Sequence, residues 1–200
     1  MSLVSRGFGR REQRRDERLP PGQYDAGDTF PVLSAGPTPR TPLSEWDLTL
    51  QGEVDGLRRW TWDEFRELPR EAVSVDIHCV TKWSKFGTRW EGVAVDTLLA
   101  DVRTESEYAV AFSDGGYTTN HRLSDLTGGR AWVVDTYDGQ PLAPEHGGPV
   151  RLLVPHLYFW KSAKWLRGFA LTRFNEPGFW ETFGYHDRGD PWLEQRYSGD

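Results

Sequence analysis

The chain has 200 residues, 37% of them hydrophobic and 14% aromatic, with ten tryptophans, so it can bury one sizeable core. No apolar run is long enough to span a bilayer, and the net charge of −6 disfavours nucleic acid as a partner. The single cysteine excludes an internal disulfide and gives no sign of an oxidising compartment.

The N-terminal segment, residues 1–29, is rich in charge, proline and glycine and carries six arginines before residue 19. Glutamate, glutamine and aspartate follow the arginines, whereas a twin-arginine export signal needs an apolar segment there, so we expect a cytoplasmic protein. The composition predicts a basic, flexible arm, with a docking role as the alternative. We expect a single domain over residues 30–200.

The first elements of that domain are predicted from proline, alternation and capping patterns. Residues 30–43 are punctuated by proline and should cross the surface as extended chain, and residues 46–54 alternate like a strand. Thr61 and Glu64 form the pattern of a capping box, so a short helix should begin at Thr61 and stop at Pro69.

The rest of the chain is predicted mainly as strands. Strands are predicted at residues 72–80, 107–113 and 164–173, a buried strand within 147–160, a hairpin at 131–142 around Asp138 and Gly139, and a short helix at 94–102. A turn at 114–116 follows the predicted strand at 107–113. The tail from Asn175 shows no periodicity, and no internal repeat is found. The sum is a strand-dominated α+β domain.

Cys79 lies in the stretch VDIHCVTKWSKFGTRWEGV, residues 75–93, and four roles compete for it. The first role is that of a buried hydrophobe and the second that of a ligand in a multi-cysteine metal site. The third is that of a nucleophile, and the fourth that of a lone thiolate on a soft metal held by a cofactor. One cysteine excludes the second role. A nucleophile needs a base, and His78 should point to the opposite face of the strand. The remaining histidines reach Cys79 only through the fold: His121, His146, His156 and His186.

A cofactor with an anionic group needs a pocket, and the segment HGGPVRLLVPHLYFWKSAKW, residues 146–165, is a candidate. Arg151, Lys161 and Lys164 lie within 14 residues of a chain that has only four lysines. Arginine makes bidentate contacts with phosphate and lysine supplies a point charge, while Gly147 and Gly148 permit close backbone approach. The alternative is a solvated basic face beside aromatic residues.

These segments together resemble the sulfite oxidase superfamily of molybdopterin oxidoreductases. The resemblance runs from about Phe30 to Gly168 and is closest to the bacterial branch that includes the catalytic subunit of periplasmic methionine sulfoxide reductase. Its specific elements are CVTKWS from Cys79, the following WEGV, and the segment 146–165, which fit the family's Cys-Val-x-x-Trp-Ser and Gly-x-Pro-x-Arg-Leu…Pro…Lys-x-x-Lys patterns. It implies a sulfite oxidase-type molybdopterin-binding domain.

The resemblance also implies roles for individual residues. Cys79 would supply a thiolate to molybdenum, and the dithiolene of one molybdopterin would supply two more sulfurs. By position, the phosphate contacts match His146 and Arg151, and the segment that closes over the cofactor matches Ser162, Ala163 and Lys164. Ser113 or Asp114 lies where the family often places a hydroxyl contact.

Departures from the family pattern bear on the substrate. Sulfite oxidases carry an arginine shortly after the cysteine, where this chain has Trp83 and Ser84 and no arginine before Arg89, so we do not expect sulfite. The methionine sulfoxide reductase branch often has an acid where this chain has Thr81, so peptide-sulfoxide repair is not implied.

We therefore expect a monomeric molybdopterin-dependent oxidoreductase that performs oxygen-atom transfer or a related two-electron step on a small-molecule substrate. An external carrier, a haem or flavin protein, would exchange the electrons. Aromatic residues are candidate pocket walls, with ordinary core packing as the alternative: Trp83, Trp90, Tyr158 and Trp160. Two other classes stay open, namely a metal-free binding module that keeps the fold and a cysteine hydrolase.

Overall fold

Strands make up most of the regular structure in residues 17–200, the part of the chain that the computed structural model describes. The strands are β1 (Tyr24–Asp25), β2 (Asp47–Gly52), β3 (Arg58–Thr61), β4 (Glu71–His78), β5 (Trp83–Ala94), β6 (Tyr108–Ser113), β7 (Thr118–Arg122), β8 (Trp132–Tyr137), β9 (Gln140–Pro141), β10 (Arg151–Leu153) and β11 (Leu166–Thr172). The α-helices are α1 (Trp62–Glu67), α2 (Val95–Leu99), α3 (Leu123–Leu126) and α4 (Phe179–Thr182). The expected strand-dominated α+β class is confirmed.

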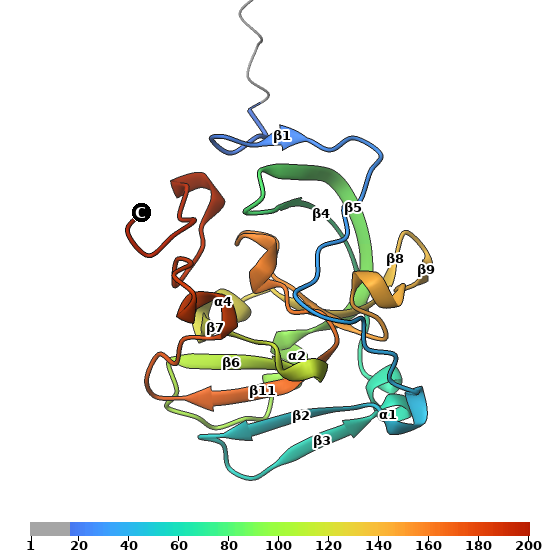
Figure 1. Cartoon of the computed structure of the whole chain (residues 1–200). Coiled ribbons are helices and arrows are strands. Elements are labelled where there is room, and N and C mark those ends of the chain that lie inside the picture. Colours follow the sequence, from blue (N-terminus) through green and yellow to red (C-terminus); the bar gives the residue numbers. More distant parts are fainter. Residues whose placement is uncertain (1–16) are drawn as a thin grey trace, which may run out of the picture.

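Two sheets form the framework (Figure 1). In the first sheet, β5 pairs in parallel with β1 and antiparallel with β4 and β8, and β8 also pairs with β9 and β10. The second sheet has the order β3-β2-β11-β6-β7, in which β11 is parallel to β2 and every other pair is antiparallel. Because β11 lies between β2 and β6, the second sheet is complete only when a late segment of the chain has been inserted.

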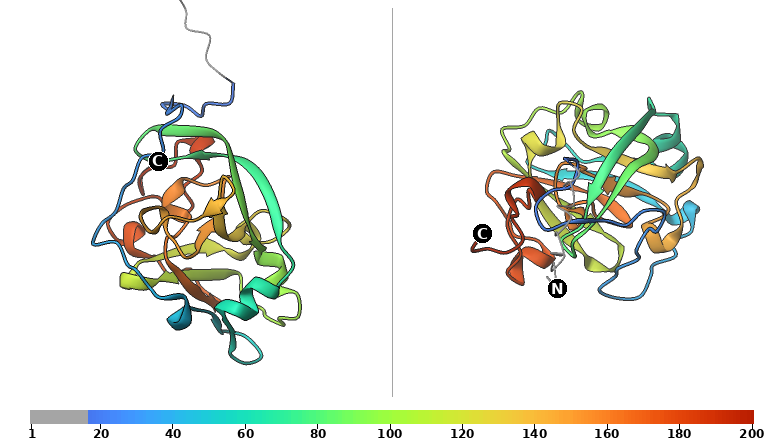
Figure 2. Two further views of the ribbon diagram at one scale, coloured as in Figure 1. Left: turned by 90° about the vertical axis from the view of Figure 1, so that its right-hand side faces the viewer. Right: turned by 90° about the horizontal axis from the view of Figure 1, so that it is seen from above.

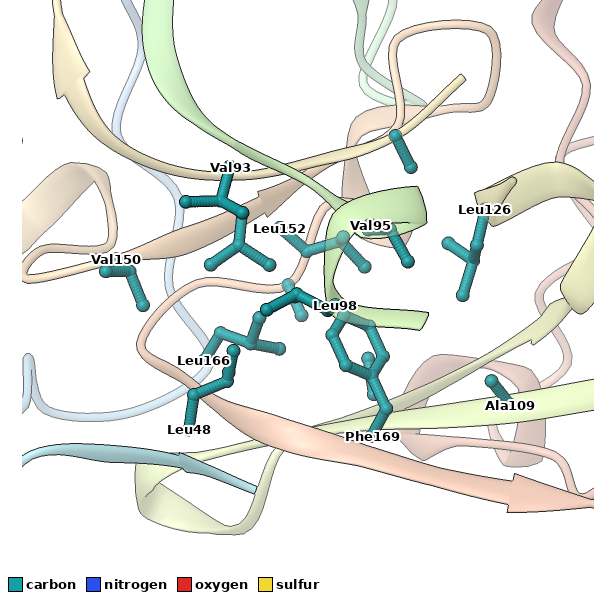
Figure 3. Close-up of a cluster of buried hydrophobic side chains, with 14 of the residues drawn as sticks. Leu48, Val93, Val95, Leu98, Ala109, Leu126, Val150, Leu152, Leu166 and Phe169 are labelled. Carbon is teal, nitrogen blue, oxygen red and sulfur yellow. The ribbon is translucent and has the colours of Figure 1, made fainter. Parts of the chain in front are cut away.

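The main core lies between the two sheets (Figure 3). Val93 and Leu152 reach it from β5 and β10, Leu98 from α2, and Leu48 and Phe169 from β2 and β11; each is at most 3% exposed. Burial of such a side chain contributes about 1.5–3 kcal/mol, so this cluster holds the sheets together.

A second cluster of buried residues lies at the β4–β5 hairpin, and four of its ten described members are aromatic, against three of twenty in the main core. Its members are Ile77, Cys79, Trp83, Trp90, Ala94, Trp132, Val134, Leu142, Leu153 and Phe159. Cys79 therefore belongs to a packed aromatic region on the first sheet, whereas the main core is largely aliphatic.

Helix α1 begins where its sequence pattern predicts. The Thr61 hydroxyl accepts a hydrogen bond from the Glu64 amide at 3.4 Å, and the Glu64 carboxylate accepts one from the Thr61 amide at 2.8 Å. Both halves of the capping box are present, which satisfies two amides at the start of the helix. The helix ends at Glu67, before Pro69.

Replacing Thr61 with Ala is expected to lower the free energy of unfolding by about 1 kcal/mol, because the helix loses its cap. Thermal unfolding followed by circular dichroism measures the change. Glu64→Gln is the matched control, since its amide oxygen still accepts from the Thr61 amide, and it should cost clearly less. Equal losses in the two variants would contradict the capping interpretation.

Strand β5, the longest in the described chain, was not predicted, nor were β1, β3, β7, α3 and α4. Its exposed Arg89 and Glu91 flank the buried Trp90, as a half-buried strand requires, but glycines interrupt the pattern. At Gly92 an added Cβ would lie 2.1 Å from the Val133 oxygen, so the β5–β8 approach at this bulge requires glycine.

The chain before residue 30 is not uniform where it is described. Tyr24 and Asp25 pair with Trp83 and Ser84 at the start of β5, and Pro20 is buried. The predicted arm at residues 1–29 thus ends in a segment attached to the first sheet, while residues 1–16 lie outside the described part. Within residues 17–200, no helix is long and apolar enough to cross a membrane.

Candidate functional site

Cys79 lies in the tight turn that joins β4 to β5. Its amide donates to the Trp83 oxygen at 2.8 Å, and its own oxygen accepts from the Lys82 amide at 3.0 Å. Lys82 has a φ of 75°, in the left-handed region that closes the turn. The sequence predicted that the strand would run through residue 80, but β4 ends at His78. The strand ends earlier than predicted because hydrogen bonds within the turn replace those between the strands from Cys79 onward.

The Cys79 thiol is buried, with 7% of the residue exposed, and the Thr81 hydroxyl donates to Sγ at 3.2 Å. Burial raises the pKa of the thiol; the Thr81 hydrogen bond and the charge of Arg151 oppose that shift. The thiol is therefore protonated at neutral pH unless a cation or metal stabilises the thiolate.

No histidine serves as a base for this thiol. Within the described residues, no imidazole forms a hydrogen bond with Cys79; the His78 Nδ1 lies 2.8 Å from the Ser84 hydroxyl. Burial lowers the pKa of His78 to about 4, so its imidazole is neutral at pH 7. A raised thiol pKa without a paired base is unfavourable for a cysteine hydrolase.

Arg151, on β10, is 1% exposed and holds three backbone oxygens. Its Nη1 donates to His146 at 2.8 Å, its Nη2 to Ser162 at 2.6 Å and its Nε to Leu152 at 3.4 Å. Its guanidinium carbon lies 3.9 Å from the Phe159 ring centroid. Among residues 17–200 no carboxylate forms an ion pair with it. Burial lowers the pKa of Arg151, yet a guanidinium stays charged, so the site keeps a buried cation without a paired anion.

Lys164 and His146 lie beside this guanidinium. The Lys164 ammonium donates to the Leu33 oxygen at 2.8 Å and to the Glu145 oxygen at 2.7 Å. Burial lowers the pKa of Lys164 to about 8, with the charge of Arg151 as a second cause; the charge of a Cys79 thiolate acts in the opposite direction. Burial also lowers the pKa of His146, helped by the charges of Arg151 and Lys164.

Gly147 allows these cations to approach one another. It has a φ of 110°, and an added Cβ would lie 3.0 Å from Lys164 Cα and 3.1 Å from Arg151 Cβ. A larger residue would therefore separate the two basic side chains. His146, the preceding residue, stacks on Phe30 with ring centroids 4.0 Å apart.

Ser162 and Ala163 contribute chiefly through the backbone. The Ser162 hydroxyl accepts from the Val154 amide at 2.9 Å, and the Ala163 oxygen accepts from the Leu152 amide at 2.8 Å. Both residues are 1% exposed. These bonds fix the backbone next to β10 and thereby the position of Lys164.

Ser113 and Asp114 lie at the end of β6, on the second sheet. The Asp114 amide donates to the Trp165 oxygen at 2.9 Å, which places this pair beside the residue after Lys164. The Asp114 carboxylate pairs with Arg167 at 3.1 Å and accepts from the Thr41 hydroxyl, whereas the buried Ser113 hydroxyl has no hydrogen-bond partner in the described chain. Of the two, only Ser113 has an unused polar group.

The aromatic candidates differ in their surroundings. Trp90 is 1% exposed and donates to the Thr88 hydroxyl, and the Trp160 indole donates to Glu181, so both have conventional core contacts. By contrast, the Trp83 indole nitrogen and the Tyr158 hydroxyl are buried without a hydrogen-bond partner in residues 17–200. Buried polar groups normally have partners, so the Trp83 indole, which packs in the same cluster as Cys79, has an unused donor at this site.

The residues brought together thus combine one soft thiol with two basic groups, Arg151 and Lys164, that form no ion pair with a carboxylate of the described residues. Arg151 packs on Phe159, which belongs to the same buried cluster as Cys79, and it donates to the His146 oxygen. Lys164 lies across Gly147 from it. Thiolates favour soft metals, and two cations without carboxylates favour an anion such as phosphate. This donor set fits a cofactor that carries both a metal and a phosphate. Fold and site together therefore define a domain suited to an anionic metal cofactor.

Comparison with known proteins identifies that cofactor class. Residues 35–180 match the family described as "Oxidoreductase molybdopterin binding domain", and the chain belongs to this family. It is therefore a molybdopterin-binding domain of the sulfite oxidase superfamily, as the sequence patterns predicted.

Individual relatives agree with this family. The chain is 42% identical over 197 residues to "Uncharacterized oxidoreductase YuiH" of Bacillus subtilis (strain 168), covering 96% of this chain and 99% of the relative. It is 28% identical to "Putative protein-methionine-sulfoxide reductase subunit YedZ1" of Azospira oryzae, covering 70% of this chain and 53% of the relative. The crystal structure of the sulfane dehydrogenase SoxCD from Paracoccus pantotrophus has a similar fold, with a TM-score of 0.62 and 17% identity over 68% of this chain and 40% of that one.

Three residues at this site were missed by the sequence analysis. Gln23 donates to the Cys79 oxygen at 3.1 Å, Phe30 stacks on His146, and Arg196 donates to the Val80 oxygen at 2.6 Å. All three lie far from their partners in sequence. Phe30 marked the start of the resemblance, but no local pattern links Gln23 or Arg196 to Cys79.

Proposed function

We propose that this protein is a molybdenum-dependent oxidoreductase that catalyses oxygen-atom transfer or a related two-electron reaction on a small molecule. The observation that carries the proposal is a single buried thiol within electrostatic reach of Arg151 and Lys164, neither of which forms an ion pair with a carboxylate in residues 17–200. Membership of the molybdopterin-binding family supports it.

In this proposal the Cys79 thiolate is the metal ligand contributed by the chain. A metal would remove the energetic penalty that burial imposes on the thiolate, and the Thr81 hydroxyl would tune its electron density by donating to Sγ. When bound, the molybdenum–pterin group supplies the redox equivalents and the site of oxygen exchange. Trp83 and Phe159 exclude water from the thiol.

The basic residues would hold the phosphate of the cofactor. Lys164 and the guanidinium of Arg151 supply charge, and His146 and the backbone at Ser162 and Ala163 shape the site. Ser113 is the proposed additional hydroxyl contact, since its oxygen has no partner in the described chain. Asp114 is the weaker candidate because its carboxylate already forms an ion pair with Arg167.

The proposed electron-transfer partner follows from the same chemistry. A two-electron metal cycle needs an external carrier for single electrons, so we propose a haem or flavin protein in that role, acting on a monomeric cytoplasmic enzyme. A metal-free binding module would have the same fold without this redox requirement. Metal content therefore separates the two classes.

Protein produced in a molybdenum-replete host is expected to carry about one molybdenum and one pterin per chain, because the proposed site has one thiolate ligand and one group of phosphate contacts. Elemental analysis and pterin fluorescence after acid release measure both quantities. Protein from a host that cannot synthesise the pterin is the control. Absence of molybdenum even after reconstitution with the cofactor would support the metal-free module instead.

Retention of the cofactor is expected to fall as the pH rises above about 8. Burial, aided by Arg151, lowers the pKa of Lys164 to that value, so the ammonium that attracts the phosphate loses its proton. Pterin remaining on the protein after gel filtration at pH 7 and pH 9.5 measures the effect. Lys164→Arg is the matched control, because a guanidinium stays charged over this range and should make retention less dependent on pH. An unchanged pH dependence in that variant would exclude Lys164 as its source.

A further inference from the structure

The two ends of the described chain meet at the turn that carries Cys79 (Figures 1 and 2). From the N-terminal side, residues 20–25 pair with the start of β5 through β1. From the C-terminal side, residues 185–197 fold back beside the same hairpin. Both segments lie outside residues 35–180, the region that matches the family.

Arg196 connects these segments to the turn. Its Nη1 donates to the Val80 oxygen at 2.6 Å and its Nη2 to the Pro21 oxygen at 3.3 Å. The guanidinium carbon lies 5.0 Å from the Tyr158 ring centroid, and the residue is only 9% exposed. One buried side chain therefore contacts the residue after Cys79, the N-terminal segment and the loop that precedes Lys164.

The position of Arg196 is itself fixed by the tail. Its amide donates to the Asp200 carboxylate at 2.8 Å, its oxygen accepts from the His186 amide at 3.1 Å, and Tyr185 pairs with Tyr197 in an isolated bridge. The tail is thus folded on itself around the arginine. Because the backbone of Arg196 is held in this way, less conformational entropy is lost when its side chain binds the turn.

Gln23, in the N-terminal segment, binds the peptide oxygen that precedes the one bound by Arg196. Its side-chain amide donates to the Cys79 oxygen at 3.1 Å, so the oxygens of two successive turn residues, Cys79 and Val80, are held by side chains from the two terminal segments. Rotation of either peptide would break one of these bonds. These contacts therefore restrain the backbone of the turn that carries the Cys79 side chain.

We infer that Arg196 is a positioning residue for Cys79, with Gln23 as its counterpart from the N-terminal segment. Together they hold the 79–82 turn in the conformation that keeps the thiol in the buried cluster that contains Phe159, the ring on which Arg151 packs. That this position suits a metal depends on the proposed function. The restraint on the turn is independent of the proposed function and can be tested in protein without cofactor.

Alkylation of the thiol in cofactor-free protein tests the inference, because Cys79 is the only cysteine in the chain. Iodoacetamide modification of the folded protein is followed by intact mass. Loss of a charge-assisted hydrogen bond should make opening of the turn, and hence alkylation, about tenfold faster or more in Arg196→Ala. Arg196→Lys, which keeps a donor for the Val80 oxygen, should restore much of the protection.

Two controls separate this effect from general loosening. Arg188→Ala removes another arginine of the same tail, one that pairs with Asp125 and not with the turn. Thr61→Ala destabilises the protein at a distant helix cap. In both variants the alkylation rate should stay within about twofold of the wild-type rate. The inference would be overturned by equal alkylation rates in Arg196→Ala and the wild-type protein. It would also be overturned if Arg188→Ala raised the alkylation rate as much as Arg196→Ala does.

Gln23→Ala keeps the test valid should Arg196→Ala not fold, since Gln23 is only partly buried and its loss removes one bond to the turn. A several-fold increase in alkylation supports the restraint, and an unchanged rate overturns it. Failure of the proposed function is recognised separately, because it appears as absence of molybdenum whatever the alkylation rates are.

Discussion

Replacing Cys79 with Ser is expected to abolish turnover while leaving the fold nearly intact. The hydroxyl cannot replace a soft thiolate as a ligand for a high-valent metal, so the loss falls on the metal site. The packing change is one atom, and the Thr81 hydroxyl remains as a hydrogen-bond partner, so the free energy of unfolding should fall by no more than about 1–2 kcal/mol. Thermal unfolding, molybdenum content and rate with a dye as electron carrier give the three quantities.

Thr81→Val is the matched control for this experiment. It keeps the thiol and removes only the hydroxyl that donates to Sγ. It should retain molybdenum and measurable turnover, with a shifted reduction potential, because hydrogen bonds to a ligand sulfur tune the metal. A Cys79→Ser variant that turns over at the wild-type rate would show that Cys79 is not the metal ligand.

Arg151→Ala is expected to reduce cofactor occupancy and stability together. A charge-assisted contact with phosphate is worth about 1.5–3 kcal/mol, so cofactor affinity should fall roughly ten- to a hundredfold. The same change removes donors to the His146 and Ser162 oxygens, which leaves buried acceptors unsatisfied and should destabilise the fold by about 2–4 kcal/mol. Molybdenum per chain and thermal unfolding measure the two effects.

Lys164→Ala separates binding from folding. Lys164 is only half-buried, so this variant should lose cofactor with a smaller loss of stability than Arg151→Ala. Arg89→Ala, which removes an exposed arginine paired with Asp138, should change neither occupancy nor stability appreciably. In every variant the rate per bound molybdenum should stay near the wild-type value. Full occupancy with a collapsed rate per molybdenum would place Arg151 or Lys164 at the substrate and not at the phosphate.

Elements with a local signal were predicted well. The capping box of Thr61 and Glu64 fixed the start of α1, and Asp138 and Gly139, both with positive φ, form the hairpin turn that their sequence predicts. By contrast, β5 escaped prediction because two glycines weaken its alternation, and one of them, Gly92, is required by the close approach of β8. The end of β4 was placed two residues late, since the turn bonds of Cys79 do not alter the hydrophobic pattern.

The sequence by itself determined the cofactor class, because the Cys79 pattern and the Gly-Arg-Lys pattern of residues 147–164 are each local and occur in the family's order. Only the tertiary structure decided which basic groups lack an acidic partner: Arg151 has none in the described chain, whereas Lys161, in the same segment, pairs with Glu181 at 2.6 Å. It also decided that Gln23 and Arg196 hold the Cys79 turn. Those contacts join residues 56 and 116 positions apart, and such separations leave no periodicity or spacing to read, since only the packing of the completed sheets brings the residues together.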